Sequence, residues 1–259
     1  MFAEERQQTI YDMVCKKRSV KVTELSQLLK ISEVTVRRDL EELHNQNKIL
    51  RTHGGALAKY SVANEVSAPE LISSHKCAEE KRKIAELAYT FVKDNDTIIA
   101  DGSSTVYELI KLIAVGKRKH IKVITSSLLV MSTLAACGEV KVIMAGGEVN
   151  YRHNNLEGHI TKEVIKNLRA DKCFIGVNGI DEKFGYSTPR FEDAESKALM
   201  VESGIESFVL ADNTKFDKTY LARINIRCNY LITDTRLAGY DYEWLLGHTK
   251  VLFADRKKR

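Results

Sequence analysis

The apolar residues of the first 58 positions recur with the spacing of short helices. Side chains three and four positions apart share one face of a helix, so apolar residues at that spacing mark the side that packs into a core. Three such stripes occur: Ile10, Met13 and Val14; Leu25, Leu28 and Leu29; and Val36, Leu40 and Leu43. The pattern predicts three helices, a short strand around residues 20–22, and a strand at residues 49–52 that leads into a glycine turn.

From residue 79 the pattern changes to short apolar runs separated, in most cases, by helical stretches. Continuous apolar strands that alternate with helices are typical of a parallel sheet covered on both faces, which is the α/β fold class. The predicted strands lie at residues 97–100, 122–125, 141–144, 173–176, 208–211, 230–233 and 251–254. Residues 58–78 show no period and contain Pro69. We therefore expect a first domain at 1–58, a linker at 59–78 and a larger domain at 79–259.

Composition excludes several classes of protein. The longest uncharged run, residues 123–138, carries five hydroxyl side chains, and a membrane-spanning helix needs about 20 mostly apolar residues. The N-terminus is charged at once and lacks the apolar core of a signal peptide. Five cysteines lie far apart with no Cys-x-x-Cys pair. We expect a reduced, cytoplasmic protein without a zinc ribbon.

The net charge of +5 is concentrated at the two ends of the chain. Residues 1–59 carry a net charge of +3 and the last four residues carry +4, whereas residues 60–255 carry −2. This asymmetry weakly favours a nucleic-acid-binding module joined to a second domain of another kind.

The third predicted helix carries polar groups suited to DNA. With Val36, Leu40 and Leu43 facing inward, the outward residues near its start are Ser32, Thr35, Arg38 and, in part, Arg37. A helix N-terminus favours phosphate, and arginine bonds guanine edges in the major groove. The alternative is an ordinary solvated helix in which Arg37 and Arg38 pair with Glu41 and Glu42.

The surrounding elements favour the DNA-binding interpretation. Three helices followed by a strand and a glycine turn make a winged helix-turn-helix, in which Lys48, Arg51 and His53 lie where a wing contacts the DNA backbone. Here the sequence resembles the DeoR family of bacterial sugar-metabolism regulators. The residues that carry the resemblance are Val22 to Leu25, Ser32, Thr35 to Leu40, Arg51 and His53 to Ala56. The resemblance implies that Arg37 and Arg38 contact DNA and that Asp39 orients Arg38 or caps a loop.

Polar residues and glycines follow six of the predicted strands. Ligands of open parallel sheets bind beyond the carboxyl ends of the strands, where these loops converge. The candidate ligand-binding residues are Asp101, Gly102, Ser103, Ser104, Thr105, Thr125, Ser126, Gly146, Gly147, Asn178, Asp181 and Lys215. The plainer alternative is that these loops are polar because loops lie on the surface.

The chemistry of these loops suits a phosphorylated polyol. The loop at residues 102–105 offers backbone N–H groups to an anion at a helix start, Lys215 adds a positive charge, and Asp101, Asp181 and Asp212 suit sugar hydroxyls. No dinucleotide, triphosphate or metal-ligand motif occurs, so we expect no cofactor and no metal. His153 and His159 are expected at the surface or beside the ligand.

The resemblance extends to the larger domain. DeoR-family sensor domains are similar to sugar-phosphate isomerases of the ribose-phosphate type, and this chain matches at, among others, Asp101 to Thr105, Gly146-Gly147, and Glu192 to Lys197. Two positions depart from the family pattern. Ser126 stands where asparagine is usual, which bears on effector specificity. Asn178 stands where an acid is common, which removes a group that an isomerase needs for proton transfer.

Together these features predict a DNA-binding transcriptional regulator of carbohydrate metabolism. We expect a repressor that binds operator double-stranded DNA, responds to a phosphorylated sugar effector, and forms a homo-oligomer, a dimer or tetramer. One alternative is a sugar-phosphate isomerase with a nucleic-acid-binding appendage, for which Asp181, Glu192 and Glu195 are the candidate proton acceptors. A second alternative, a structural DNA-binding protein, would not need convergent polar strand ends.

Overall fold

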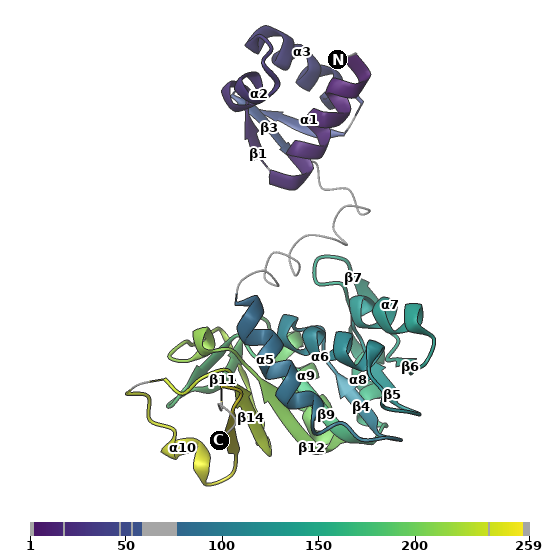
Figure 1. The fold of residues 1–259 in the computed structure, drawn as a ribbon, viewed down its shortest axis with the longest axis vertical. Helices are drawn as coiled ribbons and strands as arrows, with labels where there is room; N and C mark the ends of the chain where they lie inside the picture. Colours follow the sequence, from purple (N-terminus) through teal and green to yellow (C-terminus); the bar gives the residue numbers. More distant parts are fainter. Residues whose placement is uncertain are drawn as a thin grey trace. The chain divides into compact units, whose positions relative to one another are not determined.

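The computed structural model describes residues 3–17, 19–46, 48–52, 54–58, 77–237 and 239–255. The chain divides into two compact units, residues 1–64 and 65–259 (Figure 1). Most of the predicted linker, with Pro69, lies outside the described residues, and so does His53.

The N-terminal unit contains three helices and a small antiparallel sheet. Its elements are α1 (Ala3–Lys17), β1 (Ser19–Lys21), α2 (Val22–Leu29), α3 (Glu33–Asn45), β2 (Ile49–Thr52) and β3 (Gly55–Ala58). The strand order is β1-β3-β2. The central strand, β3, follows the glycine turn, and the sequence pattern did not predict it. The result is the expected winged helix-turn-helix.

The apolar stripes pack into one core in this unit, with one exception. Ile10, Val14, Leu25 and the inward residues of α3 are buried together. Leu28 is 56% exposed, so the prediction that it faces inward is wrong. The reason is that α2 is only eight residues long and is covered on one side, where Leu25 is fully buried and Leu29 partly so.

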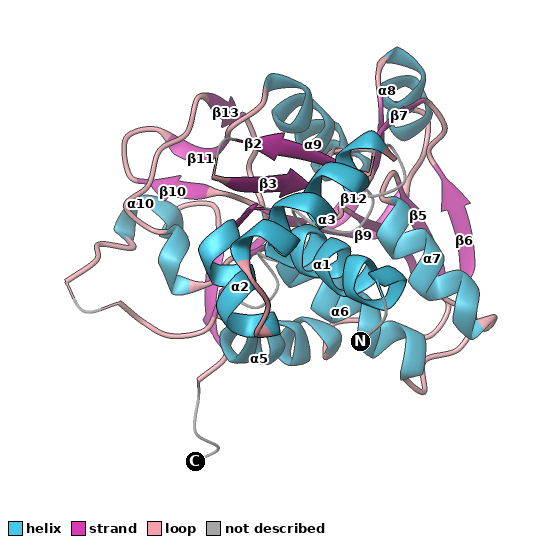
Figure 2. Cartoon of the chain, turned by 90° about the horizontal axis from the view of Figure 1, so that it is seen from above, coloured by secondary structure: helices cyan, strands magenta, loops and turns pink. Residues whose placement is uncertain are grey.

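The large unit is built on a seven-stranded parallel sheet, as predicted. Figure 2 draws helices in cyan and strands in magenta, with β5, β6, β9 and β12 of this sheet labelled. Its strands are β4 (Thr97–Ala100), β5 (Lys122–Thr125), β6 (Lys141–Met144), β9 (Ala170–Gly176), β12 (Gly204–Leu210), β14 (Tyr230–Thr233) and β15 (Lys250–Phe253). Each contains, or overlaps almost completely, one predicted strand. The helices are α5 (Ala78–Tyr89), α6 (Ser104–Val115), α7 (Leu128–Cys137), α8 (His159–Lys166), α9 (Phe191–Ser203) and α10 (Glu243–Leu246).

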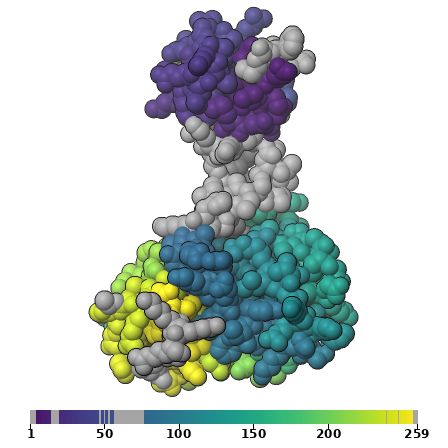
Figure 3. Space-filling model, in the orientation of Figure 1, coloured from purple at the N-terminus to yellow at the C-terminus, as the bar shows by residue number. Residues whose placement is uncertain are grey.

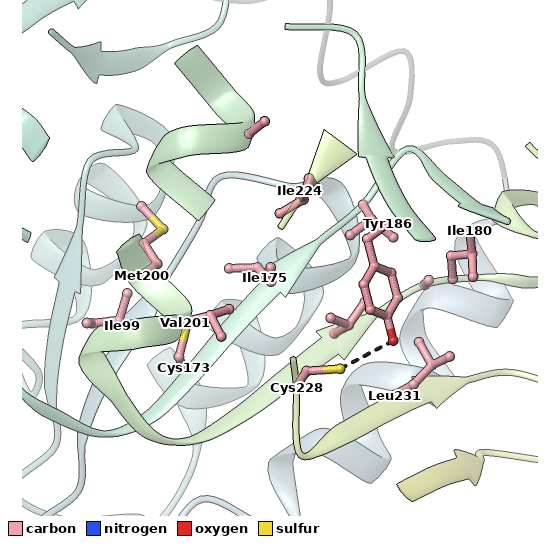
Figure 4. Close-up of a cluster of buried hydrophobic side chains, with 14 of the residues drawn as sticks. Ile99, Cys173, Ile175, Ile180, Tyr186, Met200, Val201, Ile224, Cys228 and Leu231 are labelled. Atoms are coloured by element: carbon pink, nitrogen blue, oxygen red, sulfur yellow. Dashed lines mark hydrogen bonds between the residues drawn. The ribbon is translucent and has the colours of Figure 1, made fainter. Parts of the chain in front are cut away.

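Side chains of the central strands alternate between two cores. Ile98, Phe174 and Phe208 face the cluster that contains residues of α5, α6 and α7. Ile99 and Ile175 face the other cluster, which α8 and α9 complete and part of which Figure 4 shows. The sheet is therefore covered on both faces, and this two-sided burial explains why its strands are continuously apolar.

Smaller elements lie at the carboxyl ends of the large sheet. A three-stranded antiparallel sheet contains β10 (Gly179–Asp181), β11 (Gly185–Thr188) and β13 (Ala222–Ile224), and β7 (Glu148–Asn150) pairs with β8 (Asn155–Glu157). A short 3-10 helix, η2 (Asn213–Lys215), follows β12. The sequence pattern did not predict these elements, which are only three or four residues long.

The strand order places a switch point beside β4. The order β15-β14-β12-β9-β4-β5-β6 shows that the chain runs outward from β4 to β6, then returns to β9 on the other side of β4. Loops after β4 and β9 therefore diverge, and such a point is where open α/β sheets bind ligands. Lys83 of α5 pairs with Asp255, which follows β15, at 2.8 Å. In Figure 3 the yellow C-terminal segment accordingly lies beside the blue segment that contains α5.

Candidate functional site: a DNA-binding helix and a ligand pocket

The first candidate site is the exposed face of α3. Ser32 caps this helix, because its Oγ accepts a hydrogen bond from the Thr35 backbone N–H at 3.2 Å. The two hydroxyls are also 2.8 Å apart. Val36, Leu40 and Leu43 are buried, which leaves the opposite face of the helix open to solvent.

The arginines of this face have different surroundings. Arg37 pairs with Glu33, one helical turn before it, at 2.7 Å. Arg38 is exposed and forms no ion pair within the described part of the chain. The predicted alternative, pairing with Glu41 and Glu42, does not occur there, because Glu41 instead pairs with Arg51 of β2. Lys48 is exposed beside that strand.

Asp39 has a structural role that differs from the expected one. Its carboxylate accepts two hydrogen bonds from Arg6 of α1, at 2.6 and 3.0 Å, and one from Gln7 at 3.4 Å. The aspartate is 2% exposed. The expectation that it orients Arg38 or caps a loop is therefore wrong. Asp39 points toward the core side of α3 and fastens α1 to α3.

The second candidate site is a pocket of about 300 Å³ at the switch point of the large sheet. Loops after β4, β5, β9 and β12, the β8 strand, the segment between β11 and α9, and one face of α9 supply its walls. The lining residues are Asp101, Gly102, Ser103, Ser104, Thr105, Ser126, His153, Asn155, Gly176, Val177, Asn178, Thr188, Pro189, Arg190, Asp193, Ser196, Lys197, Met200, Leu210 and Lys215.

A buried ion network forms part of the lining of this pocket. Lys197 of α9 pairs with Asp101, and its Nζ lies 3.5 Å from Asp193. Burial alone would lower the pKa of the Lys197 ammonium, but the two carboxylates outweigh it and hold that pKa above its ordinary value. Asp101 also accepts hydrogen bonds from the Ser103 N–H at 3.0 Å and the Gly176 N–H at 2.9 Å.

These contacts change the role expected of Asp101. Both of its carboxylate oxygens are occupied by groups of the chain, including the Ser103 hydroxyl at 2.7 Å. We expected this aspartate to bind sugar hydroxyls; instead it holds together the β4 loop, β9 and α9. Asp212 is likewise engaged, because it caps η2 by accepting a hydrogen bond from the Thr214 N–H at 3.0 Å.

The start of α6 forms one wall of the pocket. The first amides of a helix have no partner within the helix, so the N–H groups of Ser104 and Thr105 are available there. Glycine is required beside them, because a Cβ on Gly102 would lie 2.7 Å from the Ser127 Oγ. Lys215 lines the same pocket and pairs with no carboxylate among the residues described.

Another wall of the pocket carries a paired arginine and a histidine. Arg190 donates two parallel hydrogen bonds to Glu157 of β8, at 2.6 and 2.7 Å. Burial, and next the nearby Arg190 charge, lower the pKa of His153. The Thr188 hydroxyl lies 2.6 Å from Asp193 and 3.0 Å from Asn178. Asn155 completes this wall, and its buried Oδ1 has no hydrogen-bond partner within the described chain.

Eight of the twelve predicted ligand-binding residues line the pocket. They are Asp101, Gly102, Ser103, Ser104, Thr105, Ser126, Asn178 and Lys215. The other four lie outside its lining and stabilise nearby loops. The Thr125 hydroxyl accepts from the Ser127 N–H, the Gly146 carbonyl accepts from the Thr161 hydroxyl, and Asp181 caps the β10–β11 turn.

Gly147 has a conformational reason for being glycine. Its φ is +131°, a region that side chains disfavour, and a Cβ there would collide with Thr161.

Sequence reasoning missed the pocket residues of α9 and the segment before it. Asp193 and Lys197 are four positions apart, so one helical face brings both to the pocket. That spacing was a usable signal. Arg190 gave none, because its partner Glu157 is 33 positions away.

Two of the candidate proton acceptors of the isomerase alternative lie at exposed positions. Glu195 is bound by Lys162 of α8, and the Glu192 carboxylate lies 3.8 Å from Arg190. Both side chains are more than half exposed, and neither lines the pocket. No group of three or more metal-ligating side chains occurs among the described residues. In the same part of the chain, no helix is long and apolar enough to cross a membrane.

Comparison with known proteins covers both units. Residues 6–62 match the DeoR-like helix-turn-helix domain, and residues 76–235 match the DeoR C-terminal sensor domain. The regulator GolR of Listeria innocua is 34% identical over 92% of each chain. The repressor GlcR of Bacillus subtilis is 32% identical over 90% of this chain and 89% of its own length.

Among solved structures, ribose 5-phosphate isomerase A of Methanocaldococcus jannaschii is similar with a TM-score of 0.41 and 16% identity, over 54% of this chain and 55% of its own. Both domain matches are to DeoR-type domains, and both relatives are transcriptional regulators. The chain belongs to the DeoR family, whose members are DNA-binding transcriptional regulators and not enzymes.

Proposed function

We propose that this regulator is a repressor of carbohydrate genes and that a phosphorylated sugar in the large-unit pocket controls its binding to operator DNA. The observation that carries the proposal is the pairing of the α6 N-terminus with Lys215 in one pocket. Backbone amides at a helix start and a nearby ammonium form a typical phosphate site.

The charge balance of the pocket supports this placement. Lys197 is shared between Asp101 and Asp193, and Arg190 is neutralised by Glu157. The remaining positive groups of the pocket lining are Lys215 and the first turn of α6. An anionic ligand would therefore bind with its phosphate at these groups.

The remainder of the pocket offers groups that suit hydroxyls. Ser126, His153, Asn155 and Asn178 line it, and each can donate or accept a hydrogen bond. A volume of about 300 Å³ is at the small end of ligand pockets. This size supports a single sugar phosphate as the effector.

The names of two relatives support the same class of effector and target. A 27% identical relative in Escherichia coli is the glycerol-3-phosphate regulon repressor, and a 28% identical relative in Lactococcus lactis is the lactose phosphotransferase system repressor. One of these names contains a phosphorylated polyol, and both describe repressors. We extend this to the present chain as repression of carbohydrate genes in the cytoplasm.

We also propose that the protein acts as a homo-oligomer, a dimer or tetramer. A winged helix of this size makes few DNA contacts, so tight binding needs two or more copies on repeated half-sites. The proposed division remains a DNA-binding domain at 1–58, a linker at 59–78 and a sensor and oligomerisation domain at 79–259. Limited proteolysis tests this division, because first cleavage inside either domain would contradict it.

A thermal-shift screen tests the effector. The full chain is heated with hexose and pentose phosphates, their parent sugars, and inorganic phosphate. We expect at least one sugar phosphate to raise the Tm while its parent sugar does not, because a ligand that binds only the folded state stabilises it. Lys215→Ala should abolish this rise, whereas Lys218→Ala, a nearby exposed lysine outside the pocket lining, should keep it. An equal response to the parent sugar would contradict the phosphate site.

Calorimetric titration of the active sugar phosphate, with and without operator DNA, then tests control. Two coupled sites change each other's affinity by the same factor, which is about 5- to 150-fold in typical allosteric proteins. Equal affinities in the two titrations would show that the pocket does not control DNA binding.

A further inference from the structure

Val34, the second residue of α3, is an apolar side chain that the fold leaves in solvent. It is 72% exposed, whereas the other aliphatic residues of α3, Val36, Leu40 and Leu43, are at most 1% exposed. The core of the N-terminal unit therefore does not require an apolar residue at this position.

The position of Val34 on the helix is specific. Residues three and four positions apart share one face of a helix, so Val34 shares its face with Arg37 and Arg38. Val34 and Arg38 lie opposite the buried stripe, Arg37 lies at the edge of that face, and all three are exposed. They also belong to the first turns of α3, and the first residues of a recognition helix are the ones that contact base edges in the major groove.

We propose that Val34 reads a thymine by contacting its C5-methyl group. In the major groove, nearly every group on the base edges is a hydrogen-bond donor or acceptor, and the thymine methyl is the apolar exception. An isopropyl side chain can discriminate there only through that methyl. The inference rests on the DNA binding of the family and is independent of the proposed effector.

The neighbouring side chains strengthen this assignment. Ser32 and Thr35 bond each other across the helix start, and Glu33 is paired with Arg37. Among the described residues of this face, Arg38 forms no ion pair or side-chain hydrogen bond, and Val34 is apolar. These two side chains are therefore free to contact a base. Arginine is suited to guanine or phosphate, so thymine recognition falls to Val34.

The test starts with selection of duplexes from a random-sequence library, using the full chain, because the selected duplex then serves as the probe. Each thymine of that duplex is replaced in turn by deoxyuridine, which removes only the methyl group. We expect one thymine in each half-site whose replacement weakens binding about fourfold, the factor that burying one methyl-sized group is worth. This measurement uses the unaltered protein, so it does not depend on the folding of a variant.

Three variants complete the experiment. Val34→Ala should bind the thymine duplex about fourfold more weakly and lose the deoxyuridine penalty at that one position. Val34→Thr, which keeps one methyl, should retain part of the penalty. Val115→Ala is the matched control, because Val115 is 83% exposed at the end of α6 in the other unit, and it should behave as the unaltered protein.

The salt dependence distinguishes base reading from phosphate contact. The slope of log affinity against log salt should be the same for Val34→Ala and the unaltered chain, because no phosphate contact is lost. The proposal is overturned if no thymine shows a methyl penalty, or if Val34→Ala retains that penalty in full.

Discussion

The two candidate sites of the chain place their charged residues in different environments. In the N-terminal unit Arg38 and Lys48 are exposed, whereas in the large unit Lys197 and Asp101 are buried against each other, with side chains 7% and 6% exposed. The physical difference lies in the ligand. A DNA duplex binds to the surface of a protein, so the residues that contact it can remain exposed to solvent. A small ligand must be enclosed, so the charges around it lose water and need partners.

This difference predicts which substitutions affect function without affecting stability. Surface charges contribute little to the stability of the folded state, so the exposed arginines of α3 can be replaced with little loss of stability. Removing one partner of a buried ion pair strongly lowers the free energy of unfolding, because the other charge stays buried without a partner. The ligand pocket should therefore be coupled to the stability of its unit, and the DNA-binding face should not.

The largest expected effect is that of Lys197→Ala. This change leaves Asp101 buried and uncompensated, and we expect a loss of about 3–5 kcal/mol in the free energy of unfolding. The matched control is Lys162→Ala, which removes the more exposed ion pair with Glu195 and should cost no more than ~1 kcal/mol. Urea denaturation measures both. Equal losses for the two variants would show that burial of the first pair does not matter.

A smaller effect is expected in the DNA-binding unit, and in affinity only. Arg38→Ala should weaken operator binding by roughly 1–3 kcal/mol if Arg38 contacts a base, with the unfolding free energy changed by no more than about 0.5 kcal/mol. Arg37→Ala should have less effect, because Arg37 is already paired with Glu33.

Fluorescence anisotropy on the selected duplex at several salt concentrations measures these affinities. A phosphate contact would instead reduce the salt slope by about one unit. A larger loss for Arg37→Ala than for Arg38→Ala would contradict the comparison within α3.

The smallest expected effect is the contribution of one pocket residue, His153, to the pH dependence of stability. Burial and Arg190 lower the pKa of His153 in the folded state, so between that pKa and the unfolded value of about 6.5 the unfolded chain binds more protons. Stability therefore falls as pH falls through this window. His153→Gln should remove this component, and His248→Gln, at an exposed position in the large unit, should not. Denaturation midpoints at pH 7.5 and 5.5 measure it, and an unchanged pH dependence in His153→Gln would refute it.

Local periodicity was enough to predict both folds and the exposed face of α3. The stripe of Val36, Leu40 and Leu43 decides which side of α3 is buried, and so which side is exposed to solvent. The seven apolar runs likewise became the seven strands of one parallel sheet. The loops at the carboxyl ends of parallel strands meet at one edge of the sheet. For this reason eight of the predicted loop residues line one pocket.

What only the tertiary structure decided is which charged groups meet. Asp39 binds Arg6, 33 positions away, and Asp101 binds Lys197, 96 positions away. Neither aspartate has the role that was expected before its distant partner was known. The physical reason is that periodicity reports which side of a helix or strand is buried, a property of a few consecutive residues. The partner of a buried charge depends instead on which distant elements pack together.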